Sequence, residues 1–272
     1  MTGESAVVLG PGGPVGTAWL AGLAAGLRRK GVDLGAADLV VGTSAGAIVG
    51  AILASGGDLD RLAALPAPTH PEGGVRTDPE KLAEVFATLG DTDLERVEAL
   101  RRAGRLAVTA STGTEEAAIA RMRFLVGGAE WPTRPLLITS VDAETGEPVI
   151  WDRHGAASLP EAVAASTAFP ATAPPITIGG RRYIDGALRS GTNTDLAGAA
   201  RVLIVAEPTA HMFGANGSEP DETVVVRLVP DAEAIEAFGP DITDLATWAP
   251  AYQAGVRQAP DAAKRIRAVW EP

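Results

Sequence analysis

The sequence has no cysteine, few aromatic residues and few histidines. Aromatic side chains make up 4% of the 272 residues, and there are three histidines. The lack of cysteine excludes disulfide bonds and thiolate sites and fits a reducing compartment. Apolar residues still reach 46%, so the core must be built mainly from closely packed Ala, Val, Leu and Ile.

An excess of positive charge is also absent. The chain carries 23 Lys and Arg against 34 Asp and Glu, a formal net charge of −11. This balance argues against a nucleic-acid partner, which would need a basic stripe, and against steady adhesion to anionic membranes. The N-terminus has no basic segment followed by a long apolar one, and no stretch approaches the length of a membrane span. We expect a soluble, cytoplasmic protein.

Patterns of metal ligands are missing as well. The acidic pairs Asp58 with Asp60 and Asp91 with Asp93 are scattered and typical of loops and helix starts. We therefore expect no metal ion and no other cofactor.

Two units of strand, glycine turn and helix open the sequence. A short apolar run at residues 6–9 precedes GPGGPVG and a helical pattern at residues 17–30. A second run at residues 39–41 leads into GTSAG and a helical pattern at residues 45–55. This repetition predicts a parallel βαβ core, with ligands at the carboxyl ends of the strands. The expected class is α/β, with a mostly parallel central sheet flanked by helices.

The pattern changes between about residues 56 and 133 to Pro-rich loops and charged amphipathic segments. We interpret this stretch as a helical insertion or lid within a single domain that spans residues 1–272. Helices are predicted near residues 79–88, 93–103, 115–125 and 159–166. Strands are predicted at residues 136–141, 148–151, 176–178, 183–184, 202–206 and 224–229, with turns at 144–147 and 179–180 and a mostly helical tail from 231.

Residues 42–46 read GTSAG and match the G-x-S-x-G pattern of a serine nucleophile, with a strand before the turn and a helix after it. In so tight a turn, side chains larger than hydrogen at Gly42 and Gly46 would clash. The turn would present the Ser44 hydroxyl at the amino end of a helix, where developing negative charge is favoured. The alternative is an ordinary turn in which Ser44 caps the helix.

A nucleophilic serine needs a base, and the few histidines offer little choice. His70, His154 and His211 all fall in predicted loops, and only His211 follows the chain order of an α/β-hydrolase triad. Asp185 is better placed, directly after a short strand and before Gly186, although an aspartate before glycine is also typical of a simple turn.

Taken in order, these pieces resemble the patatin-like phospholipase family. The resemblance rests on the glycine-rich loop after the first strand, on GTSAG, on the ASTAFP stretch at residues 165–170, and on the DGA that begins at Asp185. It implies a patatin-like three-layer sandwich with helices on both sides of the sheet. It also implies a lipid ester hydrolase in which Ser44 is the nucleophile and Asp185 the proton acceptor, with no histidine required.

The resemblance also gives the opening loop a role, since its backbone N–H groups would hold the oxyanion of the tetrahedral intermediate. The prolines of GPGGPVG have no N–H group. Gly12 and Gly13 are therefore the first candidates as donors, followed by Val15 and Gly16. The family loop usually carries a basic residue where this chain has Val15. The implied partner is a lipid or acyl-ester substrate, met in transient contact with a membrane or micelle.

Other functions stay open at this point. An acyltransferase would form the same acyl-enzyme. The lack of a basic residue at Val15 is compatible with a catalytically weak lipid-binding protein. His211 is compatible with an α/β-hydrolase. A nucleotide site is disfavoured, because GPGGPVG has no lysine before Thr17 and has Val15 where a dinucleotide fingerprint needs glycine.

Overall fold

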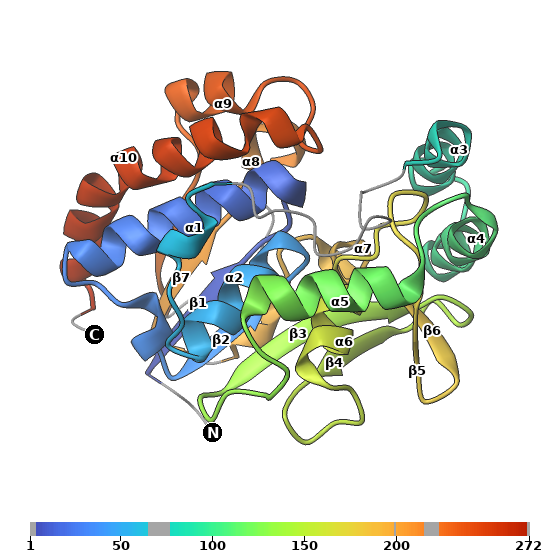
Figure 1. Ribbon diagram of the computed structural model, residues 1–272, viewed down its shortest axis with the longest axis horizontal. Helices are drawn as coiled ribbons and strands as arrows, with labels where there is room; N and C mark the ends of the chain where they lie inside the picture. Colours follow the sequence, from blue (N-terminus) through green and yellow to red (C-terminus); the bar gives the residue numbers. More distant parts are fainter. Residues whose placement is uncertain (1–3, 65–76, 199, 215–222, 271–272) are drawn as a thin grey trace. The chain divides into compact units, whose positions relative to one another are not determined.

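The computed structural model describes residues 4–64, 77–198, 200–214 and 223–270. It is a mixed α/β structure with a central sheet flanked by helices, as predicted (Figure 1). The chain divides into two compact units. The first unit contains Met1–Pro66, Pro132–Leu137 and Ser190–Pro272, and the second contains Ala67–Trp131 and Ile138–Arg189.

The first unit contains the parallel part of the sheet. Its strands lie in the order β2 (Leu39–Gly42), β1 (Ser5–Leu9), β7 (Val202–Ala206) and β8 (Val224–Leu228), and each neighbouring pair is parallel. Leu9 pairs with Gly42 on one side and with Ala206 on the other. The segments that follow these strands therefore leave the sheet at one common edge, which is where a parallel sheet binds its ligands.

The helices of the first unit include two that pack with their backbones in close contact, α1 (Gly13–Arg29) and α10 (Trp248–Arg267) (Figure 1). A Cβ built on Gly22 would lie 2.0 Å from the carbonyl oxygen of Tyr252, and one on Gly255 would lie 2.2 Å from that of Trp19. Only glycine fits at such contacts. The other helical segments are η1 (Leu34–Ala36), α2 (Ala45–Ala54), η2 (Asp60–Leu62), η3 (Thr194–Ala197), α8 (Ala210–Phe213), α9 (Ala232–Phe238) and η4 (Leu245–Thr247).

The second unit holds the antiparallel strands. β3 (Leu136–Asp142) begins in the first unit and continues here, where it pairs with β4 (Pro148–Trp151) and with β6 (Arg181–Asp185). β6 also pairs with β5 (Ile176–Ile178). The predicted turns connect β3 to β4 and β5 to β6, and the left-handed φ values of Gly146, Gly179 and Gly180 explain the glycines there.

The helices of the second unit are α3 (Pro79–Leu89), α4 (Arg96–Thr109), α5 (Glu115–Val126), α6 (Leu159–Ser166) and α7 (Ala187–Ser190), the last residue of which belongs to the first unit. The prediction placed α4 at residues 93–103, but it begins at Arg96. The reason is local: Asp91 accepts a 3.0 Å hydrogen bond from the Asp93 N–H and keeps that segment in a turn.

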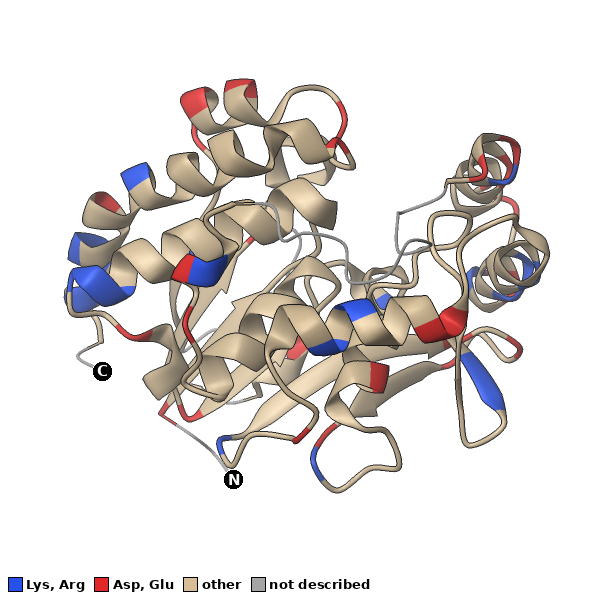
Figure 2. Ribbon diagram, in the orientation of Figure 1, with Lys and Arg blue, Asp and Glu red and all other residues tan. Residues whose placement is uncertain are grey.

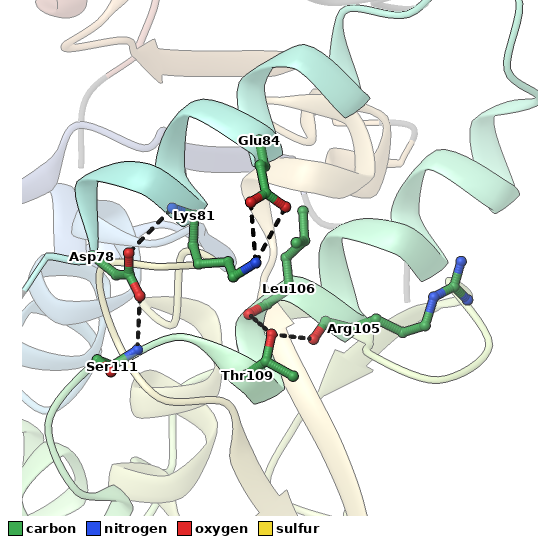
Figure 3. Close-up of polar contacts among 7 residues, drawn as sticks. All are labelled: Asp78, Lys81, Glu84, Arg105, Leu106, Thr109 and Ser111. Atoms are coloured by element: carbon green, nitrogen blue, oxygen red, sulfur yellow. Dashed lines mark hydrogen bonds and ion pairs between the residues drawn. The ribbon is translucent and has the colours of Figure 1, made fainter.

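One carboxylate ties the α3–α4 pair together (Figure 3). Asp78 caps α3 by accepting a 3.1 Å hydrogen bond from the Lys81 N–H, and its other oxygen accepts a 3.0 Å bond from the Ser111 N–H, just beyond α4. The Asp78 N–H donates to the carbonyl of Ala171, at 2.8 Å. The start of α3, the end of α4 and the ASTAFP region are thereby joined.

Basic residues gather at the carboxyl-terminal ends of α1 and α10 (Figure 2), among them Arg28, Arg29, Lys264, Arg265 and Arg267. Positive charge at this end of a helix complements the helix dipole. Within the described ranges, no helix is both long and apolar enough to cross a membrane.

Candidate active site

Ser44 occupies a strained backbone position between β2 and α2. Its φ of 54° and ψ of −116° are rare for a residue with a side chain and typically cost about 1–3 kcal/mol. The residue is 8% exposed. Ser44 stands at the N-cap of α2, yet its side chain makes no capping hydrogen bond. The arrangement therefore differs from the ordinary serine cap considered as the alternative.

The glycines on either side of Ser44 are required by contacts with backbone atoms. A Cβ on Gly42 would lie 2.6 Å from the carbonyl oxygen of Gly46, and one on Gly46 would lie 2.0 Å from that of Leu9. Hydrogen bonds join the same turn to the opening loop: the Thr43 N–H donates to Leu9 at 3.0 Å, and the Gly46 N–H donates to Gly10 at 3.1 Å. The structure thus brings the serine turn and the opening loop together at the ends of β1 and β2.

The opening loop is shorter than the sequence suggested. The prediction began the helix at Thr17, whereas α1 begins at Gly13. The cause is Pro14, whose fixed φ suits the first turn of a helix and whose missing N–H has no helical partner there in any case. The second part of GPGGPVG, from Gly13 to Gly16, is therefore the first turn of α1, and two helices, α1 and α2, begin at this edge of the sheet.

This early helix start determines which loop N–H groups remain available. Gly16 donates to the Gly12 carbonyl at 2.8 Å, and Val15 donates to the Ile242 carbonyl at 3.2 Å. Across the part of the chain that the structure describes, the N–H groups of Gly12 and Gly13 have no backbone acceptor. Among the predicted donors, these two are the groups available to an oxyanion.

Residues from late in the sequence hold the loop in place. A Cβ on Gly12 would lie 2.8 Å from Cβ of Pro208, and one on Gly13, which has a left-handed φ of 59°, would lie 2.9 Å from the Ile242 carbonyl oxygen. Thr209 donates its hydroxyl to the Pro11 carbonyl at 3.3 Å. Substitution of either glycine would displace the loop.

The sequence prediction did not include the N–H group of Ala45. Its N–H group, at the amino end of α2, also has no backbone acceptor among the described residues. In G-x-S-x-G turns the residue after the nucleophile commonly supplies an oxyanion donor, so its place in GTSAG was the available signal.

Asp185 lies in the second unit as the last residue of β6 and is 2% exposed. Its N–H donates to the carbonyl of Ala168 at 3.0 Å, and its Oδ1 accepts a 2.8 Å bond from the Ala187 N–H. A Cβ on Gly186 would lie 2.2 Å from the Thr139 carbonyl oxygen. The DGA turn is therefore fixed on β3 and on the ASTAFP segment, the other stretch that carried the resemblance.

Two of the three histidines, His154 and His211, lie on the surface of the described structure. His70 lies outside the described residues. His154 is exposed and donates its backbone N–H to Asp152. His211 is exposed on α8, with its ring 6.0 Å from that of Phe238. Among the described residues, no group of three or more His, Asp or Glu could hold a metal ion.

A family model for patatin-like phospholipase matches residues 7–197, most of the sequence. The chain belongs to the patatin-like phospholipase family. The match includes the opening loop, the Ser44 turn and Asp185, and membership implies a lipid ester hydrolase. The segments that hold the loop of this patatin-like phospholipase, around Pro208 and Ile242, lie beyond the matched residues.

Two solved structures are similar to this patatin-like phospholipase. VipD from Legionella pneumophila is 14% identical with a TM-score of 0.44, and the alignment covers 97% of this chain and 67% of that one. The type III effector protein ExoU is 20% identical with a TM-score of 0.36, covering 96% of this chain and 53% of that one, so this chain spans about half its length. No curated protein sequence matches the chain.

The loop of this family member departs from the usual pattern at Val15, and the structure gives a physical reason. The Val15 side chain is fully buried, at 0% exposure. A lysine or arginine at this position would bury a cation, which is costly unless the charge is paired. In this chain the position therefore serves packing.

Proposed function

We propose that this chain hydrolyses carboxylic esters of lipids through an acyl-enzyme on Ser44, with Asp185 as the proton acceptor. One observation carries the proposal. The turn that carries the strained Ser44, whose side chain does not cap its helix, is joined by hydrogen bonds from Thr43 and Gly46 to Leu9 and Gly10, and in the loop that follows Gly10 the N–H groups of Gly12 and Gly13 have no backbone acceptor among the described residues.

In the proposed reaction, Ser44 Oγ attacks the ester carbonyl carbon while Asp185 takes the hydroxyl proton. The C=O double bond becomes a C–O⁻ single bond, and the N–H groups of Gly12 and Gly13 stabilise the oxyanion. When the carbonyl re-forms, the bond to the leaving alcohol breaks and Asp185 returns the proton to that alcohol. Water then attacks the acyl-enzyme by the same route and releases the fatty acid.

Backbone dipoles supply the stabilisation that a loop cation would otherwise give. Removing one oxyanion donor typically costs about 3 kcal/mol in the transition state. α1 begins at Gly13 in the opening loop and α2 begins at Ala45 directly after Ser44, and the amino end of each helix carries partial positive charge. The substrate is a lipid that comes from a membrane or micelle, so transient contact with such a surface is part of the proposal.

A fluorophosphonate probe combined with an ester panel tests the proposal. Ser44 of the wild type should be labelled, and Ser44→Ala should lose both labelling and turnover. Asp185→Asn should keep the fold by circular dichroism but lose turnover by at least about a hundredfold, the range of a missing general base. Panels of acyl-chain length and head group then identify the preferred lipid. If Ser44→Ala and the wild type behave alike, the proposal is wrong.

A further inference from the structure

Two consecutive buried residues, Thr192 and Asn193, connect the two parts of the candidate site. They follow α7 and are 5% and 1% exposed. One contacts the serine turn, and the other contacts a carboxylate behind the opening loop. Neither residue belongs to the motifs that predicted the site.

Asn193 holds the serine turn. Its amide nitrogen donates a 2.9 Å hydrogen bond to the hydroxyl of Thr43, the residue before Ser44, in buried surroundings. The same nitrogen donates to the Gly191 carbonyl at 3.0 Å, and the amide oxygen accepts a 3.0 Å bond from the Ser190 hydroxyl. The amide is thus fixed at both ends. Its left-handed backbone, φ 60° and ψ 39°, is one that asparagine tolerates better than most residues.

Thr192 contacts the opening loop and the carboxylate of Glu207. Its hydroxyl donates a 2.9 Å hydrogen bond to Glu207, which follows β7 directly and is 3% exposed. The second carboxylate oxygen of Glu207 pairs with Arg227 at 2.7 Å, which compensates the buried charge. Thr192 Oγ1 also lies 3.2 Å from the place where a Cβ on Gly10 would be, so this group packs against the first residue of the opening loop.

We propose that Thr192 and Asn193 act as positioning residues that hold the Ser44 turn and the opening loop at a fixed separation. We call the three residues Thr192, Asn193 and Glu207 the clip. This inference rests on the proposed function, because the clip is proposed to set the distance between the nucleophile and the oxyanion donors. Misplacement by about 1 Å typically costs on the order of a hundredfold in rate. Two short, buried hydrogen bonds from adjacent residues leave little freedom for such displacement.

A purely structural role predicts a different result. Buried polar groups need hydrogen-bond partners in any protein, and losing one costs about 1–3 kcal/mol of stability. Such a loss would lower the amount of folded enzyme. It would leave the rate of each folded molecule unchanged, so counting active sites separates the two roles.

The experiment replaces each threonine of the two contacts by valine, which keeps the shape and removes the hydroxyl. The variants are Thr43→Val and Thr192→Val, with Thr43→Ser and Thr192→Ser to restore the hydroxyl. Thr223→Val is the matched control, because the Thr223 hydroxyl also makes a 3.0 Å hydrogen bond within the first unit, to the Ala200 carbonyl, but at the amino end of β8.

We expect Thr43→Val and Thr192→Val each to lower kcat per fluorophosphonate-titrated site by about tenfold, with KM changed less than about twofold. The serine variants should recover most of the rate. Thr223→Val should lower Tm but leave kcat per site at the wild-type value. Unchanged kcat per site in both Thr43→Val and Thr192→Val would overturn the proposal.

Hydrogen exchange gives a second readout that does not depend on turnover. Thr43→Val should speed exchange of the Gly46 amide, and Thr192→Val that of the Gly10 amide, whereas Thr223→Val should affect neither. If the wild type shows no turnover that depends on Ser44, the proposed function fails, and exchange alone decides about the clip. If exchange of the Gly46 and Gly10 amides in Thr43→Val and Thr192→Val then equals that in Thr223→Val, the proposed role of the clip is wrong.

Discussion

The backbone of Gly46 lies directly against the carbonyl oxygen of Leu9, so close that a Cβ on Gly46 would be 2.0 Å from it. No shift of a flexible side chain can relieve this contact, because the obstacle is the backbone of β1. The position of α2, and with it that of Ser44, therefore depends on a missing methyl group.

Gly46→Ala is accordingly predicted to destabilise the protein by several kcal/mol, the range of overpacked cores, and to abolish turnover. Urea unfolding followed by circular dichroism measures the loss. Gly128→Ala is the matched control, since a Cβ there would meet nothing within 4 Å. Equal stability of the two variants would contradict the close contact.

A second prediction concerns His211 and decides between a dyad and a histidine-dependent triad. His211 is exposed and packs its ring near Phe238. His211→Ala should keep nearly full kcat, whereas Asp185→Asn should lose it. Steady-state kinetics on one activated ester suffices. A loss in His211→Ala as large as that in Ser44→Ala would favour the α/β-hydrolase mechanism instead.

The Asp78 carboxylate leads to a prediction about the stability of the α3–α4 pair at low pH. Hydrogen bonds from the backbone N–H groups of Ser111 and Lys81 hold the pKa of the Asp78 carboxyl below its ordinary value (Figure 3). Because the pKa is lower in the folded protein than in the unfolded chain, the ionised carboxylate stabilises the fold at pH values above the pKa of the unfolded chain. This stabilisation is lost as the pH falls through the pKa of the folded protein. The α3–α4 pair should therefore loosen below about pH 4.

Hydrogen exchange at the Lys81 and Ser111 amides, measured from pH 7 to pH 3, checks this. Asp78→Ala, which removes both acceptor oxygens, should show fast exchange of these amides across the whole range. The control is Glu80→Gln on the same helix, whose carboxylate makes no hydrogen bond among the residues described. Protection at pH 3 in the wild type equal to that at pH 7 would refute the prediction.

The two tyrosines offer a matched pair for stability. Tyr252 donates its hydroxyl to Asp60 at 2.7 Å, and burial together with this carboxylate raises its pKa to about 12. Its hydroxyl contribution should be fully present below pH 10 and lost as pH rises toward 12. Tyr252→Phe should cost about 1–2 kcal/mol near pH 7, since the bond is to a charged group.

Tyr183 serves as the control for that substitution. Its pKa is also raised by burial, but its hydroxyl makes no hydrogen bond within the described part of the chain. Tyr183→Phe should therefore change the free energy of unfolding little. Denaturant melts of the two variants, with absorbance titration of the remaining tyrosine, test both statements. Similar losses in the two would show that the Asp60 contact adds nothing.

Sequence reasoning recovered the elements whose signals are local. GTSAG between an apolar run and an Ala-rich helix required glycine on both sides of Ser44, and the turns before β4 and before β6 required glycine at positive φ. It placed the start of α1 too late, because the glycines and prolines of GPGGPVG were taken as one loop although Pro14 suits a first helical turn.

The clip could not be foreseen in the same way. Thr192 and Glu207 have no characteristic spacing, and their pairing depends on β7 lying beside β1 and on both side chains being buried. Ile242 and Pro208, which hold the loop, likewise act through long-range packing. Such partners are set by tertiary structure, and a linear pattern does not record them.

The backbone contact between α1 and α10 also bears on the order in which the protein matures. α1 begins in the opening loop, at Gly13. Trp19 of this helix donates its indole N–H to Gln258 of α10, which lies 239 positions later in the sequence. While the chain is being synthesised, the side of α1 that packs against α10 stays uncovered until α10 leaves the ribosome. We therefore expect the opening loop to become ordered, and lipid ester hydrolysis to begin, only after α10 has docked on α1.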